Sequence, residues 1–187
     1  MPILSEFHDD QKDYKAAKTK LEGVEILDLK PWADERGFFL ELSRKQVTDK
    51  GNPAQAPLVE FWQEVDLNKA QWSMSQVDAE AYIKGLHYHL KQTDIWFCPA
   101  PSKLKVVLLD AREDSKTAGQ TQTVILGKDN FKLLKIPPGV AHGYKALTNP
   151  ANLIYCTTVP FNPSDPDEYR IAWDHEKVRD LWDVKNG

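Results

Sequence analysis

Short apolar runs, separated by proline, glycine, asparagine and aspartate, follow one another from residue 24 to residue 173. Runs of this length, rich in Val, Ile, Leu, Phe and Tyr, are typical of β-strands. The clearest runs lie at residues 24–29, 37–42, 105–110, 121–126, 132–136 and 152–159. The helical segments of about 10–15 residues that alternate with strands in a parallel sheet do not occur between them. The pattern predicts an all-β jelly roll, with helix only near the ends and around residues 55–67.

The size and charge of the chain limit its partners. With 187 residues it is expected to form one domain at 21–187, preceded by a charged N-terminal arm at 1–20. The 24 Lys and Arg residues stand against 28 Asp and Glu residues, a net charge of −4, so nucleic acid is not an expected partner.

Membrane segments and paired cysteines are not expected either. No run approaches the roughly 18 apolar residues that cross a bilayer, and the N-terminus has no signal-peptide pattern. Cys98 and Cys156 are far apart and form no C-x-x-C pair. We therefore predict a cytoplasmic protein with no membrane partner.

Three histidines stand in positions that favour a pocket. His87 and His89 are two residues apart, so on a strand both side chains face the same way while Tyr88 faces the other. His142 follows a Pro-Pro-Gly turn that would place it tightly. In a barrel this order of elements brings His87 and His142 together across the interior. A lone H-x-H pair is also compatible with a surface accident or a buried structural pair.

Several stretches, in order, resemble the dTDP-4-dehydrorhamnose 3,5-epimerase family. They are DERGFFLE at 34–41, KGLHY at 84–88, LDAREDSKTAG at 109–119, IPPGVAHGY at 136–144, IY at 154–155 and IAWD at 171–174. The resemblance implies an RmlC-like double-stranded β-helix, which is a cupin jelly roll, with short helical or irregular extensions. It also implies a homodimer that epimerises a nucleotide-linked 4-keto-deoxysugar without a cofactor.

The resemblance also implies roles for single residues. His87 matches the base that removes a proton beside the C4 ketone, and Tyr155 matches the acid that reprotonates the opposite face. A base near neutral pKa and an acid across the ring are what such a proton transfer requires. The positions that match substrate-binding residues are Arg36, Glu41, Gln71, Lys84 and His142.

Two departures from the family pattern affect the expected reaction. The lysine that stabilises the enolate falls at Asp94 or Ile95, and Lys91 is the nearest substitute. The second aromatic of the active site falls at Phe161, which has no hydroxyl. We therefore predict an epimerase or isomerase that acts at a single centre.

A third departure concerns the carboxylate that orients the catalytic histidine. The C-terminal segment that supplies this aspartate in the family has no counterpart in the sequence. Asp110 or Asp174 could replace it only from a different place in the fold. The sequence leaves this partner open.

The same departures support an alternative. His87, His89 and Asp94 form H-x-H-x4-D, and with His142 they approach the pattern of metal-binding cupins. Three imidazoles and a carboxylate suit Fe, Mn, Co, Ni or Zn, so a metal-dependent cupin enzyme is one alternative function. In the purely structural interpretation, Asp94 binds no metal and only pairs with Lys91 or His89. The other alternative function is a non-catalytic protein that binds sugar nucleotides.

Overall fold

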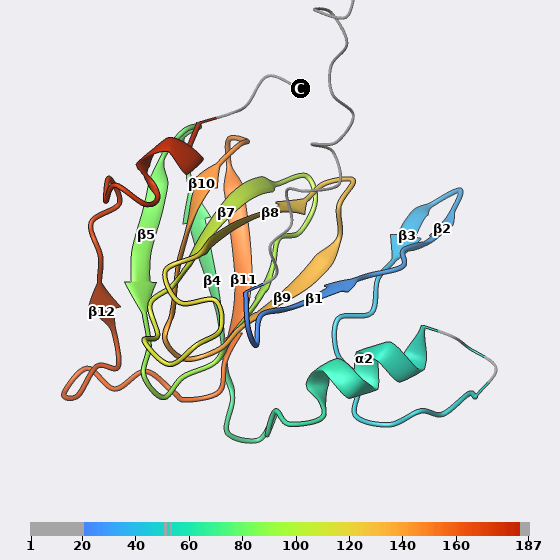
Figure 1. Cartoon of the computed structure of the whole chain (residues 1–187). Helices are drawn as coiled ribbons and strands as arrows, with labels where there is room; N and C mark the ends of the chain where they lie inside the picture. Colours follow the sequence, from blue (N-terminus) through green and yellow to red (C-terminus); the bar gives the residue numbers. More distant parts are fainter. Residues whose placement is uncertain (1–20, 51, 53, 184–187) are drawn as a thin grey trace, which may run out of the picture.

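The computed structural model describes residues 21–50, 52 and 54–183. Two antiparallel five-stranded sheets make the body of the molecule, and a two-stranded hairpin projects from it (Figure 1). The all-β jelly roll expected from the sequence is confirmed. The predicted arm at residues 1–20 lies outside the described residues. No helix in the described ranges is long and apolar enough to cross a membrane.

The first sheet has the order β1-β9-β6-β11-β4, and the second has the order β12-β5-β10-β7-β8. The strands of the first sheet are β1 (Glu25–Asp28), β9 (Lys132–Ile136), β6 (Asp94–Phe97), β11 (Ala151–Thr157) and β4 (Gln71–Val77). Those of the second are β12 (Tyr169–Arg170), β5 (Ile83–Tyr88), β10 (Val140–Ala146), β7 (Lys103–Asp110) and β8 (Thr121–Gly127). The hairpin consists of β2 (Trp32–Asp34) and β3 (Gly37–Phe39).

The main core lies between the two sheets. Leu104, Val106 and Leu108 of β7 share one buried cluster with Leu134 and Ile136 of β9. Because side chains alternate along a strand, each strand that lines this core sends its other residues outward. Two further apolar layers cover those outer faces.

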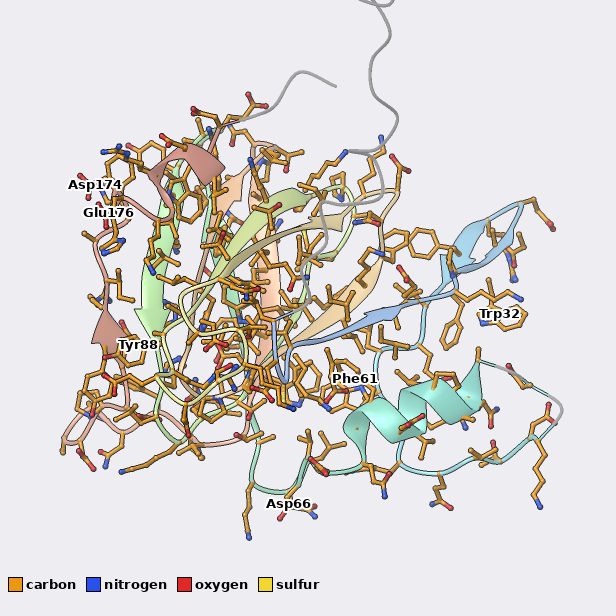
Figure 2. The ribbon with its side chains drawn as sticks, in the orientation of Figure 1. Trp32, Phe61, Asp66, Tyr88, Asp174 and Glu176 are labelled. Atoms are coloured by element: carbon orange, nitrogen blue, oxygen red, sulfur yellow. The ribbon has the colours of Figure 1, made fainter. Side chains whose placement is uncertain are left out.

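The helix α2 (Gln55–Trp62) covers the outer face of the first sheet. Its Phe61 and Trp62 pack in one cluster with Ile95 and Phe97 of β6, and Figure 2 shows Phe61 between helix and sheet. The indole Nε1 of Trp62 donates a hydrogen bond to the Leu42 carbonyl at 2.8 Å, which ties the helix to the preceding loop. The helix expected around residues 55–67 is therefore present and ends earlier.

The C-terminal segment covers the outer face of the second sheet. Val178 and Trp182, on either side of the short 3₁₀ helix η2 (Arg179–Leu181), pack with Leu86 of β5 and Val107 of β7. Tyr88 packs on this face and stacks on Tyr169 with ring centroids 5.3 Å apart. Since Leu86 and Tyr88 point outward, the alternation of β5 turns His87 into the barrel.

Candidate active site

A cavity of about 810 Å³ opens between the two sheets. Its walls carry side chains from β5 of the second sheet and from β4, β6 and β11 of the first. His87, His89, Asp94 and Tyr155 all line it. The structure therefore brings these four residues to one cavity.

The three histidines predicted to meet form one cluster. His87 on β5 pairs in register with His142 on β10, and their ring centroids lie 4.3 Å apart. The His89 ring lies 5.2 Å from that of His87 and 5.5 Å from that of His142. The Nδ1 atom of His142 lies 2.9 Å from the carbonyl oxygen of Val140, and Nδ1 of His89 contacts the carbonyl oxygen of Asp167. Because a carbonyl only accepts, both rings donate from Nδ1 and present Nε2 to the cluster.

Asp94 completes the cluster from the opposite sheet. Its carboxylate accepts hydrogen bonds from Gln92 Nε2 at 2.6 Å and from Trp96 Nε1 at 3.1 Å. Its oxygens lie 3.5 Å from His142 Nε2 and 3.8 Å from His89 Nε2. Burial acts to raise the pKa of Asp94, but interactions with His142, His89 and Gln92 prevail and lower it to about 2. The carboxylate is therefore ionised, and its partners are histidines rather than Lys91.

His87 differs from the other two imidazoles. Burial, followed by the charges of His142 and His89, lowers the pKa of His87 to about 3, so the ring is neutral at pH 7. It makes no hydrogen bond to any residue that the structure describes. A pKa of about 3 lies below the near-neutral value expected of a general base, so the neutral ring and its place on the cavity wall support His87 as a proton acceptor, whereas its pKa does not.

Tyr155 faces the cluster from β11, where it pairs in register with Trp96 of β6. The two candidate catalytic side chains thus come from opposite sheets, His87 from the second and Tyr155 from the first. A ring bound between them would have one on each face. The Tyr155 hydroxyl has no hydrogen-bond partner within residues 21–50, 52 and 54–183.

A second tyrosine on the wall belongs to a polar chain that the sequence did not indicate. The hydroxyl of Tyr144 lies 3.0 Å from Ser75 Oγ, which accepts a hydrogen bond from Lys84 Nζ at 2.8 Å. Burial is the main cause that raises the pKa of Tyr144. All three residues line the cavity. Lys84 therefore lines the cavity, and its substrate-binding role stays a prediction.

Comparison with known proteins decides the family. A sequence model described as dTDP-4-dehydrorhamnose 3,5-epimerase matches residues 18–186. The chain belongs to the dTDP-4-dehydrorhamnose 3,5-epimerase family. The spore coat polysaccharide biosynthesis protein SpsL of Bacillus subtilis is 43% identical over 166 residues, covering 88% of this chain and 98% of that protein. The dTDP-4-dehydrorhamnose 3,5-epimerase of Shigella flexneri is 31% identical over 172 residues, covering 90% of this chain and 87% of that enzyme.

Solved structures agree with this family. The epimerase of Legionella pneumophila in complex with dTDP-4-keto-L-rhamnose superimposes with a TM-score of 0.67 at 27% identity, covering 87% of this chain and 79% of that one. A dTDP sugar isomerase from Desulfovibrio desulfuricans gives 0.66 at 27% identity, covering 87% and 92%. Membership confirms the prediction of a carbohydrate epimerase for nucleotide-linked keto-deoxysugars and does not favour a metal-dependent enzyme of another class.

Two residues with predicted substrate-binding roles lie apart from the epimerase cavity in the single chain. Arg36, at the exposed β2–β3 turn, pairs with Asp34 at 2.5 Å, and Glu41 accepts a hydrogen bond from Arg44 at 2.7 Å. Figure 1 shows the hairpin well away from β5. Neither residue is part of the described cavity wall, so their roles stay predictions that would need a second chain.

The other predicted contacts are close to the epimerase cavity. Gln71 lines the wall, where its Oε1 accepts the backbone N–H of Phe161 at 3.0 Å. Phe161 also lines the wall. His142 is only 1% exposed and stands behind the lining residues, so its role as a direct substrate contact stays a prediction.

The sequence analysis did not identify Asp167 and Arg170 as residues of the cavity. Other residues of the segment after β11, Asn162, Asp165 and Glu168, also line it. The carboxylate of Asp167 accepts the backbone N–H groups of Leu90, Lys91 and Gln92, which positions the segment after β5. Arg170 on β12 pairs in register with His87 and also lines the cavity. These contacts join segments more than 70 residues apart, which no local pattern reveals.

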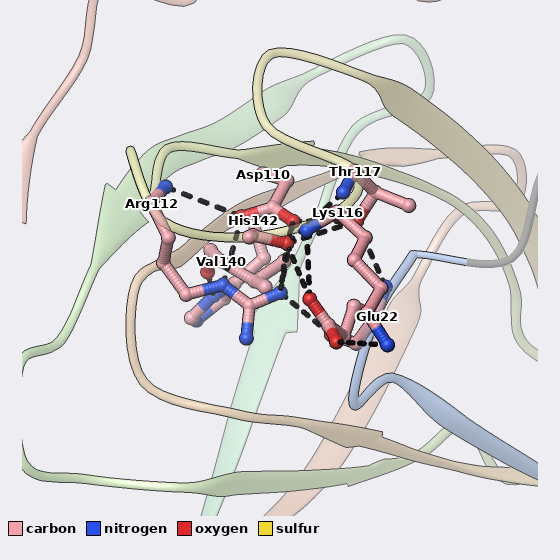
Figure 3. A network of polar contacts seen from close by, with 8 residues as sticks. Glu22, Asp110, Arg112, Lys116, Thr117, Val140 and His142 are labelled. Atoms are coloured by element: carbon pink, nitrogen blue, oxygen red, sulfur yellow. Dashed lines mark hydrogen bonds and ion pairs between the residues drawn. The ribbon is translucent and has the colours of Figure 1, made fainter.

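Neither carboxylate considered as a partner for His87 takes that role. Asp110 is held by Arg112, Ser115 and Thr117 in the network of Figure 3. Asp174 lies on the outer surface of the molecule (Figure 2). The carboxylate beside the histidines is Asp94.

Proposed function

We propose that this chain inverts one carbon beside the C4 ketone of a dTDP-linked 4-keto-6-deoxysugar, with His87 as base and Tyr155 as acid. The observation that carries the proposal is the placement of these two side chains on opposite sheets across one cavity. Inversion needs a proton to leave from one face of a carbon and return to the other. A base and an acid on opposite walls meet that requirement.

The reaction balances without an oxidant or reductant. His87 takes the proton from the carbon beside the ketone, and the electrons of the C–H bond move onto the carbonyl oxygen as an enolate. Tyr155 then delivers its phenolic proton to the opposite face, and the ketone reforms. Solvent restores the proton to Tyr155 and removes it from His87. The chemistry needs no redox cofactor.

The restriction to one centre rests on Phe161. It lines the cavity where a second aromatic hydroxyl would stand, and a phenyl ring has no proton to give. Tyr144 is engaged with Ser75 and has a raised pKa. Only the Tyr155 hydroxyl among these aromatic residues is placed to reprotonate.

Basic and amide side chains on the wall would hold the nucleotide. Lys84, Lys91 and Arg170 line the cavity, and a diphosphate requires positive charges of this kind. Lys84 is already oriented by Ser75, and Arg170 by Glu168 at 2.5 Å. Gln71 adds an amide. These few side chains would bind the diphosphate, although the net charge of the chain excludes a broad basic surface.

We also propose a cytoplasmic homodimer. Trp32, Phe38 and Phe39 are 44%, 50% and 65% exposed on the projecting hairpin, and Trp72 and Met74 are 46% and 65% exposed on the edge strand β4. Large apolar side chains that are exposed together on a hairpin or an edge strand are typical of protein interfaces. Sedimentation should give twice the mass of 21.4 kDa, and a monomer at micromolar concentration would contradict this.

The test of the activity is proton exchange with solvent. The protein is incubated with dTDP-4-keto-6-deoxyglucose in D₂O, and NMR follows deuterium at C3 and C5 of the sugar. We expect inversion and deuterium at one carbon only. Exchange and inversion at both carbons would refute the restriction to one centre. Binding of the nucleotide sugar with no exchange at either carbon would refute the activity and favour a non-catalytic binding protein.

A further inference from the structure

The ligand atoms of His87, His89, Asp94 and His142 all lie within 4.8 Å of one another. We propose that His89, Asp94 and His142 bind one divalent transition-metal ion at the base of the cavity, while His87 stays free as the base. Two imidazoles and one carboxylate are a common set of ligands for such ions. The site is independent of the proposed function, but the role we give the ion depends on it.

Both imidazole ligands are held in an orientation that suits a metal. His89 and His142 each donate from Nδ1 to a backbone carbonyl, which turns Nε2 toward Asp94. Metal-binding histidines are oriented by this kind of second hydrogen bond. His87 has no such carbonyl partner within the described ranges, which is why we leave it out of the ligand set.

The Nε2 atom of His142 is the second observation. This nitrogen is buried and has no hydrogen-bond partner in the described part of the chain. It lies 3.5 Å from a carboxylate oxygen of Asp94, so an ion bound between these two atoms would give both of them a partner. A buried polar atom without a partner is costly and calls for an explanation.

The spacing of the ligand atoms is close to that of a metal site. Ligands about 2.1 Å from one ion lie about 3–3.5 Å apart in tetrahedral or octahedral geometry. The carboxylate oxygens of Asp94 lie 3.5 Å and 3.8 Å from the two Nε2 atoms. Small side-chain movements would therefore bring the three ligands onto an ion.

Gln92 marks the place that the ion would take. Its side-chain amide donates to Asp94 Oδ1 at 2.6 Å and lies 3.1 Å from His89 Nε2. The amide thus contacts two of the atoms that an ion would use. Gln92 also lines the cavity, so it has room to turn away.

The ion would perform a task for which the cluster has no lysine. An enolate oxygen needs a positive charge beside it, and the residue at the centre of this cluster is the carboxylate of Asp94. A divalent ion on Asp94 reverses the local charge and can polarise the C4 carbonyl. His87, on the same wall, remains available for the proton.

Cobalt binding tests the site without any substrate. The protein is dialysed against a chelator and titrated with Co²⁺, with visible d–d absorption and mass-spectrometric metal content as readouts. We expect close to one Co²⁺ per chain, with affinity lowered at least about 100-fold by Asp94→Asn and by His142→Asn. His87→Asn and the exposed control His175→Asn should bind as the wild type does, and Gln92→Leu at least as tightly.

Each outcome separates the site from the function. Less than about a tenth of an equivalent of Co²⁺ in folded wild-type protein would overturn the site, as would unchanged binding by Asp94→Asn. Circular dichroism checks that each variant is folded. Proton exchange by protein that binds no metal would leave the proposed function intact. Co²⁺ binding by a protein that exchanges no substrate proton would keep the site and refute the function.

Discussion

Asp94 and Asp110 are both buried, at 3% and 1% exposure, and both have lowered pKa values, yet their surroundings differ. Asp110 receives hydrogen bonds from Arg112 at 2.8 Å through each oxygen, and from Ser115 and Thr117. Asp94 instead accepts hydrogen bonds from Gln92 and Trp96, lies 3.5 Å and 3.8 Å from the Nε2 atoms of two histidines, and lines the cavity. A carboxylate enclosed by its donors stabilises a turn, whereas one that lines a cavity is available to a ligand.

The largest expected effect comes from removing the negative charge of Asp94. Asp94→Asn should lower kcat for epimerisation at least about 100-fold, because the cluster loses its negative charge and its contact with both histidines. The free energy of unfolding should change less than in Asp110→Asn. Steady-state kinetics and urea unfolding measure the two quantities. A variant that is unstable but fully active per folded molecule would remove the distinction between the two carboxylates.

Replacing Asp110 should lower stability and leave the kcat of folded protein unchanged. Asp110→Asn leaves the Arg112 guanidinium without its ion pair, which should cost on the order of 3 kcal/mol in the free energy of unfolding. The kcat of the folded fraction should stay at the wild-type value because the network lies outside the cavity wall. Ser115→Ala is a milder change in the same network. A loss of kcat in Asp110→Asn with stability unchanged would contradict our account.

The role of Tyr155 as acid can be tested separately from the role of His87 as base. Tyr155→Phe removes the proton that returns to the far face, while His87 can still take and give back a proton on its own face. We expect inversion to fall about 100-fold or more, while deuterium still enters the carbon with its configuration retained. NMR of the recovered substrate in D₂O shows both. Equal loss of exchange and inversion would contradict the placement of the two groups on opposite faces.

The pH dependence of the unfolding free energy tests the role given to Asp110. Burial acts to raise the pKa of Asp110, but Arg112, Ser115 and Thr117 outweigh it and hold the pKa well below its usual range. A lowered folded-state pKa stabilises the protein above the unfolded value of about 3.9, and this contribution is lost as the pH falls. The gap in unfolding free energy between wild type and Asp110→Asn should therefore be constant above about pH 5 and shrink below about pH 4. If the difference in unfolding free energy instead grew as the pH fell, Asp110 would not have a lowered pKa in the folded protein.

The sequence predicted what depends on local periodicity. The alternation of a strand placed His87 inside and Tyr88 outside, and the short runs predicted β7, β8, β9 and β11 within a few residues. Alternation also explains why Asp94 and Trp96 face the cavity while Ile95 and Phe97 lie under the helix.

Contacts between distant segments were beyond sequence reasoning. Asp167 positions Gln92 from 75 residues away, and that contact places an amide on Asp94. Arg170 reaches the cavity because β12 pairs with β5. Arg36 was expected in the site by resemblance, but the hairpin that carries it projects from the body of the chain. Long-range pairing, rather than residue pattern, decides these positions.

The most direct test of the central claim is deuterium entry into the keto-sugar with His87→Asn, measured beside wild type and the exposed control His175→Asn. We predict exchange at one carbon beside the C4 ketone for wild type and His175→Asn. For His87→Asn we predict a rate lower by about 1,000-fold, with nucleotide-sugar affinity and folding retained. Exchange by His87→Asn at the wild-type rate would show that the proton is removed by another group and contradict the account.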